Sequence, residues 1–447
     1  MTDELKIPAQ EAENIPPPVE KNPLETTDGF ILPSNWARNF GILFSGQFIS
    51  GFTTFIVQYA FLWYLADKIA TASALTLAQL VIFLPYVLFL PLSGVLADRL
   101  NKKVILIGMD ILAATVAVIL SLLGATSGGF SLTWILLAMF VRSTAQAFQS
   151  PAMQSTVPYI VPEAQLTRIG GMNSMTHGLM GLIAPGVAAF LYGILPMYQI
   201  ILLDVVGATF AVSTVLLTKI PKPKHKANLS VQLFWTEFKD GLAELRTHKG
   251  ILQWAIFSMV MFAVLMPALA LYPLMTTQHF NGTIMDAGIV EMLWGLGSLL
   301  GGLLIVIIGK FKDRYWIIFM GFAAVGICMF ASGLFPGTRV FFWIFAVINL
   351  IAGTFFMGSQ GPFFAIVQES IVPEKMGRVM SVMGLVQNVG GPIGLMFSTP
   401  LAEKIGVTGM FTLSGGVLLV MMALSLFMKN MRWVDPKAPS NPMLKMK

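Results

Sequence analysis

The stretch GVLADRLNKK, residues 94–103, is a short charged turn between two long apolar runs. The runs on either side, 73–97 and 104–124, are each long enough for an α-helix that crosses a bilayer, which needs about 20 residues. Asp98 and Arg99 would be costly in hydrocarbon, so the turn is expected at a membrane surface. Two spanning helices joined by a polar turn are typical of a polytopic membrane protein.

The composition of the whole chain agrees with this interpretation. Of its 447 residues, 56% are hydrophobic and only 11% are charged, whereas soluble domains carry about 25% charged residues. The mean hydropathy is +0.76. A soluble fold of this length needs far more polar surface to cover its core, so the composition excludes a soluble enzyme.

From residue 39 onward, apolar segments alternate with short polar interruptions. The pattern predicts an all-α membrane protein with twelve transmembrane helices in two six-helix bundles. The expected helices lie near 39–66, 73–97, 104–124, 131–153, 167–192, 198–218, 252–278, 287–309, 315–334, 339–366, 379–400 and 409–428. The expected parts of the chain are a disordered cytoplasmic tail (1–35), an N-terminal bundle (36–218), a cytoplasmic linker (219–251), a C-terminal bundle (252–428) and a cytoplasmic tail (429–447).

The linker contains a second, weaker helical signal. Phe234, Phe238, Leu242 and Leu245 recur at helical spacing over 233–245, which indicates an amphipathic helix on the membrane surface. The linker begins with a basic run, and basic residues concentrate in the other segments placed on the same side. Lysine and arginine mark cytoplasmic loops, so both termini are expected in the cytoplasm and the protein in the plasma membrane.

Two pairs of short motifs indicate that the halves are related. Residues 94–99 and 309–314, which both end in Asp-Arg, are 215 positions apart. Pro151 precedes Val-Pro-Glu at 161–163 by the same spacing with which Pro362 precedes Val-Pro-Glu at 372–374, an offset of 211. Nearly equal offsets favour duplicated bundles, which in transporters rock around a central cavity.

Several kinds of chemistry are not expected. The single cysteine, Cys328, cannot form an intramolecular disulfide, and the four histidines are scattered without metal-ligand spacing. Gly309-Lys310 is followed by Phe311 and so is no phosphate-binding loop. We therefore expect neither metal nor cofactor, no enzymatic activity, no nucleic-acid partner and an ion gradient as the energy source.

The stretch 94–103 resembles the signature loop of the major facilitator superfamily, with Asn101 in place of the usual glycine. Within that superfamily the chain is similar to the bacterial macrolide-efflux branch of drug/proton antiporters. The similar stretches are 83–86, 142–148, 151–152, 161–167, 203–207, 279–283 and 369–378.

This resemblance implies a monomeric antiporter that exports bulky amphiphilic drugs, macrolides first among them, in exchange for protons, and so confers antibiotic resistance. Lipid and siderophore exporters share the architecture and remain alternatives. An importer and a non-transporting receptor on the same fold also remain open.

Ionisable residues inside predicted spans are the candidates for proton coupling, since such residues are costly in lipid and usually functional or paired. Glu291, early in the eighth helix, is the first choice. Asp204 and Asp110 are further candidates. Arg142, in mid-helix four, is also a candidate and has no partner nearby in sequence. It is expected to face the cavity and either bind substrate or pair with a carboxylate, of which Asp110 is one. A lone histidine in the fifth helix, His177, more often serves in packing.

By the same resemblance, the charged turns form a latch that holds the two bundles together in the outward-facing state. The latch residues are Gly94, Asp98, Arg99, Lys102 and Lys103 in the first half, and Asp313 and Arg314 in the second.

Some of the 28 methionines and 34 phenylalanines are expected to form a deformable apolar pocket for the drug, while most of them face membrane lipid or neighbouring helices. Methionine adapts to ligands of varied shape. Polar contacts to the drug are predicted from Gln47, Gln58, Gln146 and Asn388.

Overall fold

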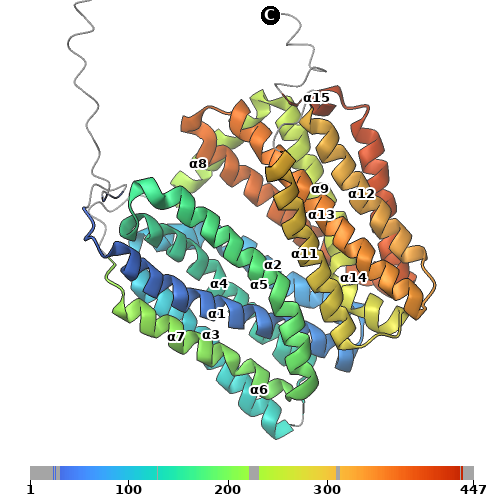
Figure 1. Cartoon of the computed structure of the whole chain (residues 1–447), viewed down its shortest axis with the longest axis horizontal. Coiled ribbons are helices and arrows are strands. Elements are labelled where there is room, and N and C mark those ends of the chain that lie inside the picture. The colour runs from blue at the N-terminus through green and yellow to red at the C-terminus, as the bar shows by residue number, and fades with distance from the viewer. Residues whose placement is uncertain are drawn as a thin grey trace, which may run out of the picture.

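The computed structural model describes residues 24, 26, 31–127, 129–220, 231–308, 313–432 and 434–435. The expected disordered tail (1–35), the basic run after residue 220 and the end of the chain therefore lie almost wholly outside the described residues. The described part is built from helices (Figure 1).

In the first half of the chain the long helices follow one another with short connections. Their bounds, with the short helical segments between them, are α1 (Trp36–Tyr64), η2 (Leu65–Ile69), α2 (Ala72–Arg99), α3 (Lys102–Ser127), α4 (Leu132–Ile160), η3 (Glu163–Gln165), α5 (Leu166–Ile194), α6 (Met197–Ile201) and α7 (Leu203–Leu217).

The second half repeats this plan after the linker helix. Its elements are α8 (Val231–Thr247), α9 (Lys249–Ala270), α10 (Tyr272–Leu274), η4 (Met275–His279), α11 (Ile284–Ile308), α12 (Arg314–Leu334), α13 (Arg339–Ser370), α14 (Pro373–Ser425) and α15 (Lys429–Arg432). The backbone of α14 changes course at Gly406, whose φ of 71° is in the left-handed region that favours glycine. Two spans, Arg378–Ser398 and Pro400–Ser425, lie within this element.

Eleven helical stretches of the described chain are long and apolar enough to cross a membrane. The remaining long helix, α4, has 29 residues. Its apolar character is diluted by Arg142 and by several glutamines and serines that line a cavity: Ser143, Gln146, Gln149, Ser150 and Gln154. With α4, the predicted set of twelve long helices is complete.

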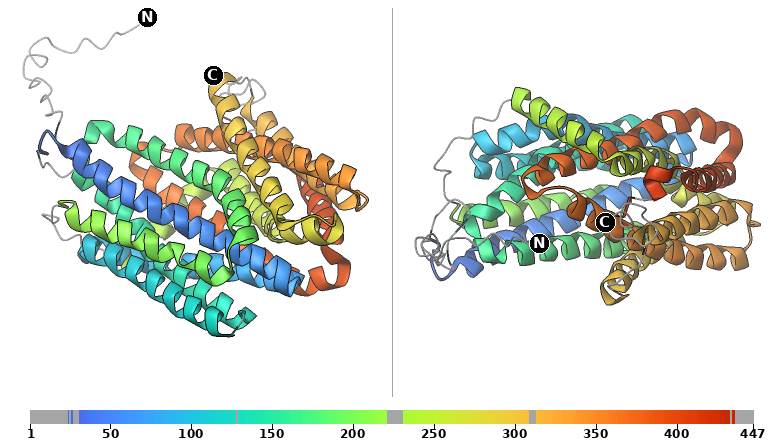
Figure 2. Two further views of the ribbon diagram at one scale, coloured as in Figure 1. Left: turned by 60° about the horizontal axis from the view of Figure 1, so that its bottom comes forward. Right: turned by 90° about the horizontal axis from the view of Figure 1, so that it is seen from above.

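The two halves use the same helix pairings. In the first, α2 packs on α4, α1 on α5, and α3 on both α4 and α7. In the second, α11 packs on α13, α9 on α14, and α12 on both α13 and α14. Equivalent pairs in the same chain order are what a duplicated bundle produces, as the motif offsets indicated. The halves join through α5 against α11 and α2 against α14 (Figures 1 and 2).

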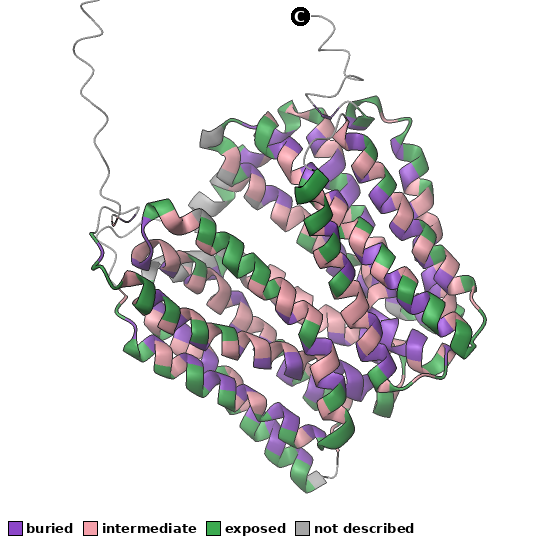
Figure 3. Ribbon diagram, in the orientation of Figure 1, coloured by how far each residue is buried: buried purple, intermediate pink, exposed green. Residues whose placement is uncertain are grey.

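Many outward-facing helix faces are apolar and yet exposed (Figure 3). Val306 and Ile307 on α11 are 77% and 70% exposed, and Leu217 on α7 is 72% exposed. A soluble protein would bury such side chains, because exposed apolar area costs free energy in water. These faces suit hydrocarbon instead.

The linker helix α8 extends the predicted 233–245 by two residues at each end. Its Leu245 is buried and Phe238 and Leu242 are half-buried against the core. Glu244 receives Lys375 of α14 at 2.6 Å. The helix is thus docked on the start of α14, and its place on a membrane surface stays a prediction.

Close helix approach in the second half depends on glycine. A methyl group added to Gly297 of α11 would collide with the carbonyl oxygen of Leu350 on α13. We predict that Gly297→Ala lowers the free energy of unfolding by about 1–3 kcal/mol, because the two helices must separate to admit the methyl group. Thermal unfolding in detergent measures this. Gly108→Ala on α3, where a methyl group meets open space, is the control and should not lower stability.

Candidate transport cavity

A cavity of about 380 Å³ lies among helices of the first half. We call it the main cavity. Its wall comes from α1, α2, α4 and α5, and the second half contributes Asn388 of α14. Along α1 it extends from Phe61 toward Phe44, near the start of that helix. On α4 and α5 it reaches Met153 and Asn173, near the connection between those helices.

The wall combines two kinds of side chain. The apolar part is mainly aromatic rings and methionines: Phe44, Phe48, Phe55, Phe61, Ile82, Phe83, Tyr86, Met139, Met153 and Met180. The polar part is mainly amides and hydroxyls: Gln47, Ser50, Thr54, Gln58, Ser143, Gln146, Gln149, Ser150, Gln154, Asn173, Thr176 and Asn388. All four residues predicted to contact the drug lie in this wall. Their part in binding stays a prediction.

At the end opposite the start of α1, contacts between the two halves close the molecule. Gln278 in η4 donates a hydrogen bond of 2.6 Å to the carbonyl oxygen of Ala70, which follows η2. Nearby, α5 and α11 pack so closely that a methyl group on Gly295 would lie 2.9 Å from the α-carbon of Leu182. The main cavity therefore has its access from the end where α1 begins.

Arg142 is the central charged group of the cavity wall. Its side chain is only 8% exposed and forms an ion pair with Asp204, which is 2% exposed. The same guanidinium donates to the carbonyl oxygen of Thr54 at 3.1 Å and lies over the ring of Phe61. The prediction that Arg142 has a carboxylate partner holds, but Asp204 rather than Asp110 supplies it. The sequence concealed the pair because α4 and α7 are separated by some sixty residues along the chain.

Asp110 of α3 is buried, at 4% exposure, in a separate hydrogen-bond network. Its Oδ1 accepts from Ser50 Oγ at 3.0 Å and from Gln149 Nε2 at 2.9 Å. Gln149 also faces Gln47, with 3.4 Å between its Nε2 and Gln47 Oε1. Sequence reasoning missed Ser50 and Gln149, because neutral polar residues in a helix give no signal until their neighbours are known.

Glu291 does not line the main cavity. It is half-buried on α11, near Tyr59 of α1 and Tyr272 of α10. It makes no hydrogen bond or ion pair with any residue that the structure describes. His177 is exposed, lines the main cavity and packs beside Phe55. The proton-coupling roles of these residues stay predictions.

The latch residues that the structure describes are engaged within their own halves. Lys102 donates to the carbonyl oxygen of Ser155 at 2.8 Å and lies over the ring of Tyr159. Lys103 approaches the carbonyl oxygen of Leu216 at 3.5 Å. The side chains of Gly94, Asp98 and Arg99 lie outside the described residues.

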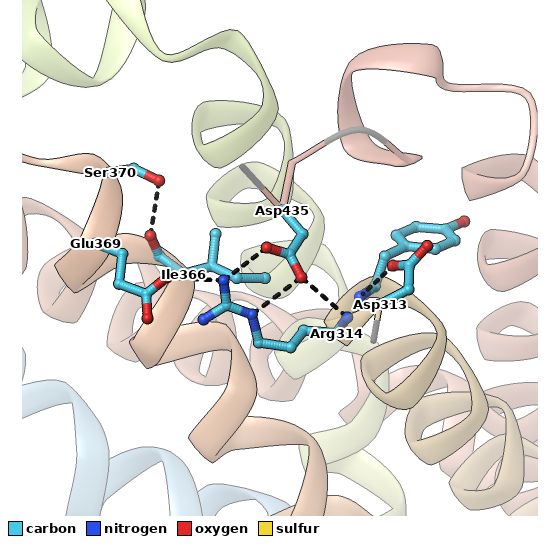
Figure 4. Close-up of polar contacts among 7 residues, drawn as sticks. Asp313, Arg314, Ile366, Glu369, Ser370 and Asp435 are labelled. Atoms are coloured by element: carbon cyan, nitrogen blue, oxygen red, sulfur yellow. Dashed lines mark hydrogen bonds and ion pairs between the residues drawn. The ribbon is translucent and has the colours of Figure 1, made fainter. Parts of the chain in front are cut away.

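The second charged turn forms a compact cluster (Figure 4). Asp313 caps α12 by accepting from Tyr315 N at 3.1 Å. Arg314 bonds Asp435 at 2.6 and 2.9 Å and Glu369 at 2.8 Å. Asp435 was not predicted, since it follows the last apolar segment. The cluster fastens the end of the chain to α12 and α13.

These features can be compared with known proteins. A model of the Major Facilitator Superfamily matches residues 43–395. The chain belongs to this superfamily. Macrolide efflux protein A of Streptococcus pyogenes is 35% identical over 90% of this chain and 99% of that protein. A protein of the same name from Enterococcus faecalis is 36% identical over 70% of this chain and 96% of its own length.

More distant similarities agree with the superfamily. The multidrug efflux pump Tap of Mycolicibacterium fortuitum is 22% identical over 85% of this chain and 93% of that protein. The nucleoside transporter NupG has a TM-score of 0.72 at 14% identity, covering 88% of this chain and all of that one. A bacterial homologue of Spinster, in an inward-facing and unoccupied conformation, has a TM-score of 0.67 at 16% identity, with 91% of this chain and all of that one covered. The predicted family, its macrolide-efflux branch and the helical fold are confirmed.

We predict that Arg142→Gln lowers the free energy of unfolding by about 3–5 kcal/mol, because Asp204 would be left buried without a counter-charge. Asp204→Asn added to Arg142→Gln should recover much of this loss, since the pair is then neutral. Thermal unfolding of both variants in detergent measures the difference. Equal stability of the single and double variants would contradict a mutual pair.

Proposed function

We propose that this transporter exports bulky amphiphilic drugs, macrolides foremost, in exchange for protons. The observation that carries the proposal is the wall of the main cavity, which combines aromatic rings and methionines with amide side chains. The 35% identity to a protein named for macrolide efflux, over nearly its full length, supports the same substrate class.

The wall suits a large ring that is apolar on one side and oxygen-rich on the other. Phenylalanine and methionine offer area to the apolar side, and methionine adapts to its outline. Glutamine and asparagine amides both donate and accept hydrogen bonds, so they match hydroxyl, ketone and ester oxygens. The volume of about 380 Å³ is at the lower end of the range of about 300–1,000 Å³ found for small-molecule pockets.

The basic residues of the polar segments favour cytoplasmic termini. With that orientation, the start of α1 and the access to the main cavity face the cytoplasm, and the contact between Gln278 and Ala70 closes the outer side. The drug then enters from the cytoplasm or the inner leaflet. Separation of the halves on the outer side, with closure on the inner side, releases it.

The latch belongs to the other conformation of this cycle. The turn at 94–103 lies on the cytoplasmic side in the proposed orientation, where the halves come together only when the outer side opens. Asp98 can then accept hydrogen bonds from the start of a facing helix, where the helix dipole favours an anion. In the present conformation Lys102 is engaged by α4 instead.

The direct test is uptake of a labelled macrolide into everted membrane vesicles, where the cytoplasmic face is outside. We predict uptake that depends on a pH gradient and collapses when a protonophore is added. Vesicles without the protein are the control. Absence of uptake by well-expressed protein would contradict the macrolide assignment, and competition with lipids and siderophores would then identify the substrate class. Glu291→Gln, assayed in parallel, tests the first-choice candidate for the proton carrier.

We also predict that Gln146→Ala raises the KM for macrolide about three- to tenfold, because one hydrogen bond contributes about 0.5–1.5 kcal/mol. Gln199→Ala, at an exposed residue of α6 away from the cavity, is the matched control. Initial uptake rates in the same vesicles measure both. An unchanged KM for Gln146→Ala would place the drug elsewhere.

A further inference from the structure

A second, much smaller cavity of about 20 Å³ adjoins the main cavity within the first half. We call it the side chamber. Its wall shares five residues with the main cavity: Ser50, Thr54, Arg142, Gln146 and Gln149. Asp110 and Asp204 complete its polar lining. A space of this size holds about one water molecule.

The carboxyl group of Asp110 is asymmetrically bonded. Ser50 Oγ and Gln149 Nε2 both donate to Oδ1. The amide of Gln47 lies beside the same carboxyl group, but Oδ2 is enclosed and forms no hydrogen bond of ordinary geometry with the residues that the structure describes. A buried acceptor without a donor is costly. A proton on Oδ2 would remove the charge from that atom and leave both bonds to Oδ1 intact.

The charges that line the side chamber also favour a protonated, neutral Asp110. Asp110 belongs to α3, and the other helices supply the rest of the charged groups in the chamber wall. Arg142 comes from α4 and Asp204 from α7, whereas α1 contributes only the uncharged Ser50 and Thr54. Arg142 and Asp204 neutralise each other as an ion pair. An ionised Asp110 then leaves one uncompensated negative charge among the described residues of the chamber. Burying such a charge is unfavourable unless a positive charge joins it.

We propose that the side chamber is the ion-coupling site of this transporter, with Asp110 as the group that holds the transported proton. The inference rests on the proposed function and specifies the site of its coupling ion. The step is a simple protonation: Oδ2 takes a proton from water to give the neutral acid, and returns it to water in the chamber. A metal cation fits less well, because the chamber has room for about one water and the Arg142 guanidinium forms part of its wall.

The location also suits the direction of exchange. The side chamber adjoins the main cavity, which is accessible in this conformation, whereas Glu291 is not among the residues that line either space. Gln149 lines both spaces and bonds Asp110, so the drug site and the proton site share a side chain. In an exchanger the two occupants exclude each other, and drug binding therefore releases the proton to the main cavity.

The first experiment needs no drug. Purified full-length protein is titrated from mildly alkaline to mildly acidic pH, and bound protons are counted for the native chain and for Asp110→Asn. We expect the variant to bind one proton fewer per molecule. Asp286→Asn is the matched control, because Asp286 is also buried but is held by Arg339 at 2.8 Å, so its removal should change the count little. An unchanged count for Asp110→Asn overturns the proposal.

The second experiment uses liposomes and a labelled macrolide. Asp110→Asn should lose uptake driven by a pH gradient, to background, and keep exchange of labelled for unlabelled drug. Glu291→Gln should keep both. If Glu291→Gln instead loses gradient-driven uptake and Asp110→Asn keeps it, Glu291 is the group that carries the proton and the proposal is overturned. If the native chain moves no macrolide at all, the proposed substrate fails while the drug-free titration still decides the proton site.

Two further measurements address the cases in which Asp110→Asn does not fold or the coupling ion is sodium. Ser50→Ala removes one donor to Asp110 and should shift the pH at which the proton is bound, whereas Ser143→Ala, which lines only the main cavity, should not. This pair decides the question if Asp110→Asn does not fold. Sodium-dependent thermal stabilisation that Asp110→Asn abolishes, without a change in bound protons, would assign a sodium ion and overturn the proton.

Discussion

The need to neutralise charge inside a low-dielectric bundle governs the first half of this transporter. Arg142 is in the middle of a helix, and a lone guanidinium there would be costly. The ion pair with Asp204 removes that cost and fixes α4 against α7. Because the pair is neutral as a whole, the carboxyl group of Asp110 has no counter-charge among the described residues of the side chamber.

This arrangement concentrates the polar chemistry on one side of the molecule. The main cavity, the side chamber and most of the amide side chains belong to α1, α4 and their neighbours in the first half. The second half contributes Asn388 to the main cavity and is stiffened by close glycine packing and by the cluster around Arg314. The halves therefore share one plan but differ in chemistry.

The contacts between the halves are compatible with movement. On the closed side they include helix packing of α5 on α11 and a hydrogen bond from Gln278 to Ala70. Such contacts can be replaced by others at a modest cost in free energy. Two described residues of the charged turns, by contrast, have their partners within their own half in this conformation: Lys102 bonds Ser155, and Arg314 bonds Asp435.

The sequence by itself determined the helical membrane fold, the repeat and the family, because apolar length and local motifs are properties of neighbouring residues. It also named Gln47, Gln58, Gln146 and Asn388, all of which lie at the cavity. Only the tertiary structure decided that Arg142 pairs with Asp204, that Ser50 and Gln149 bond Asp110, and that Asp435 holds Arg314. The partners in these contacts lie on different segments of the chain, and packing alone brings them within hydrogen-bond distance.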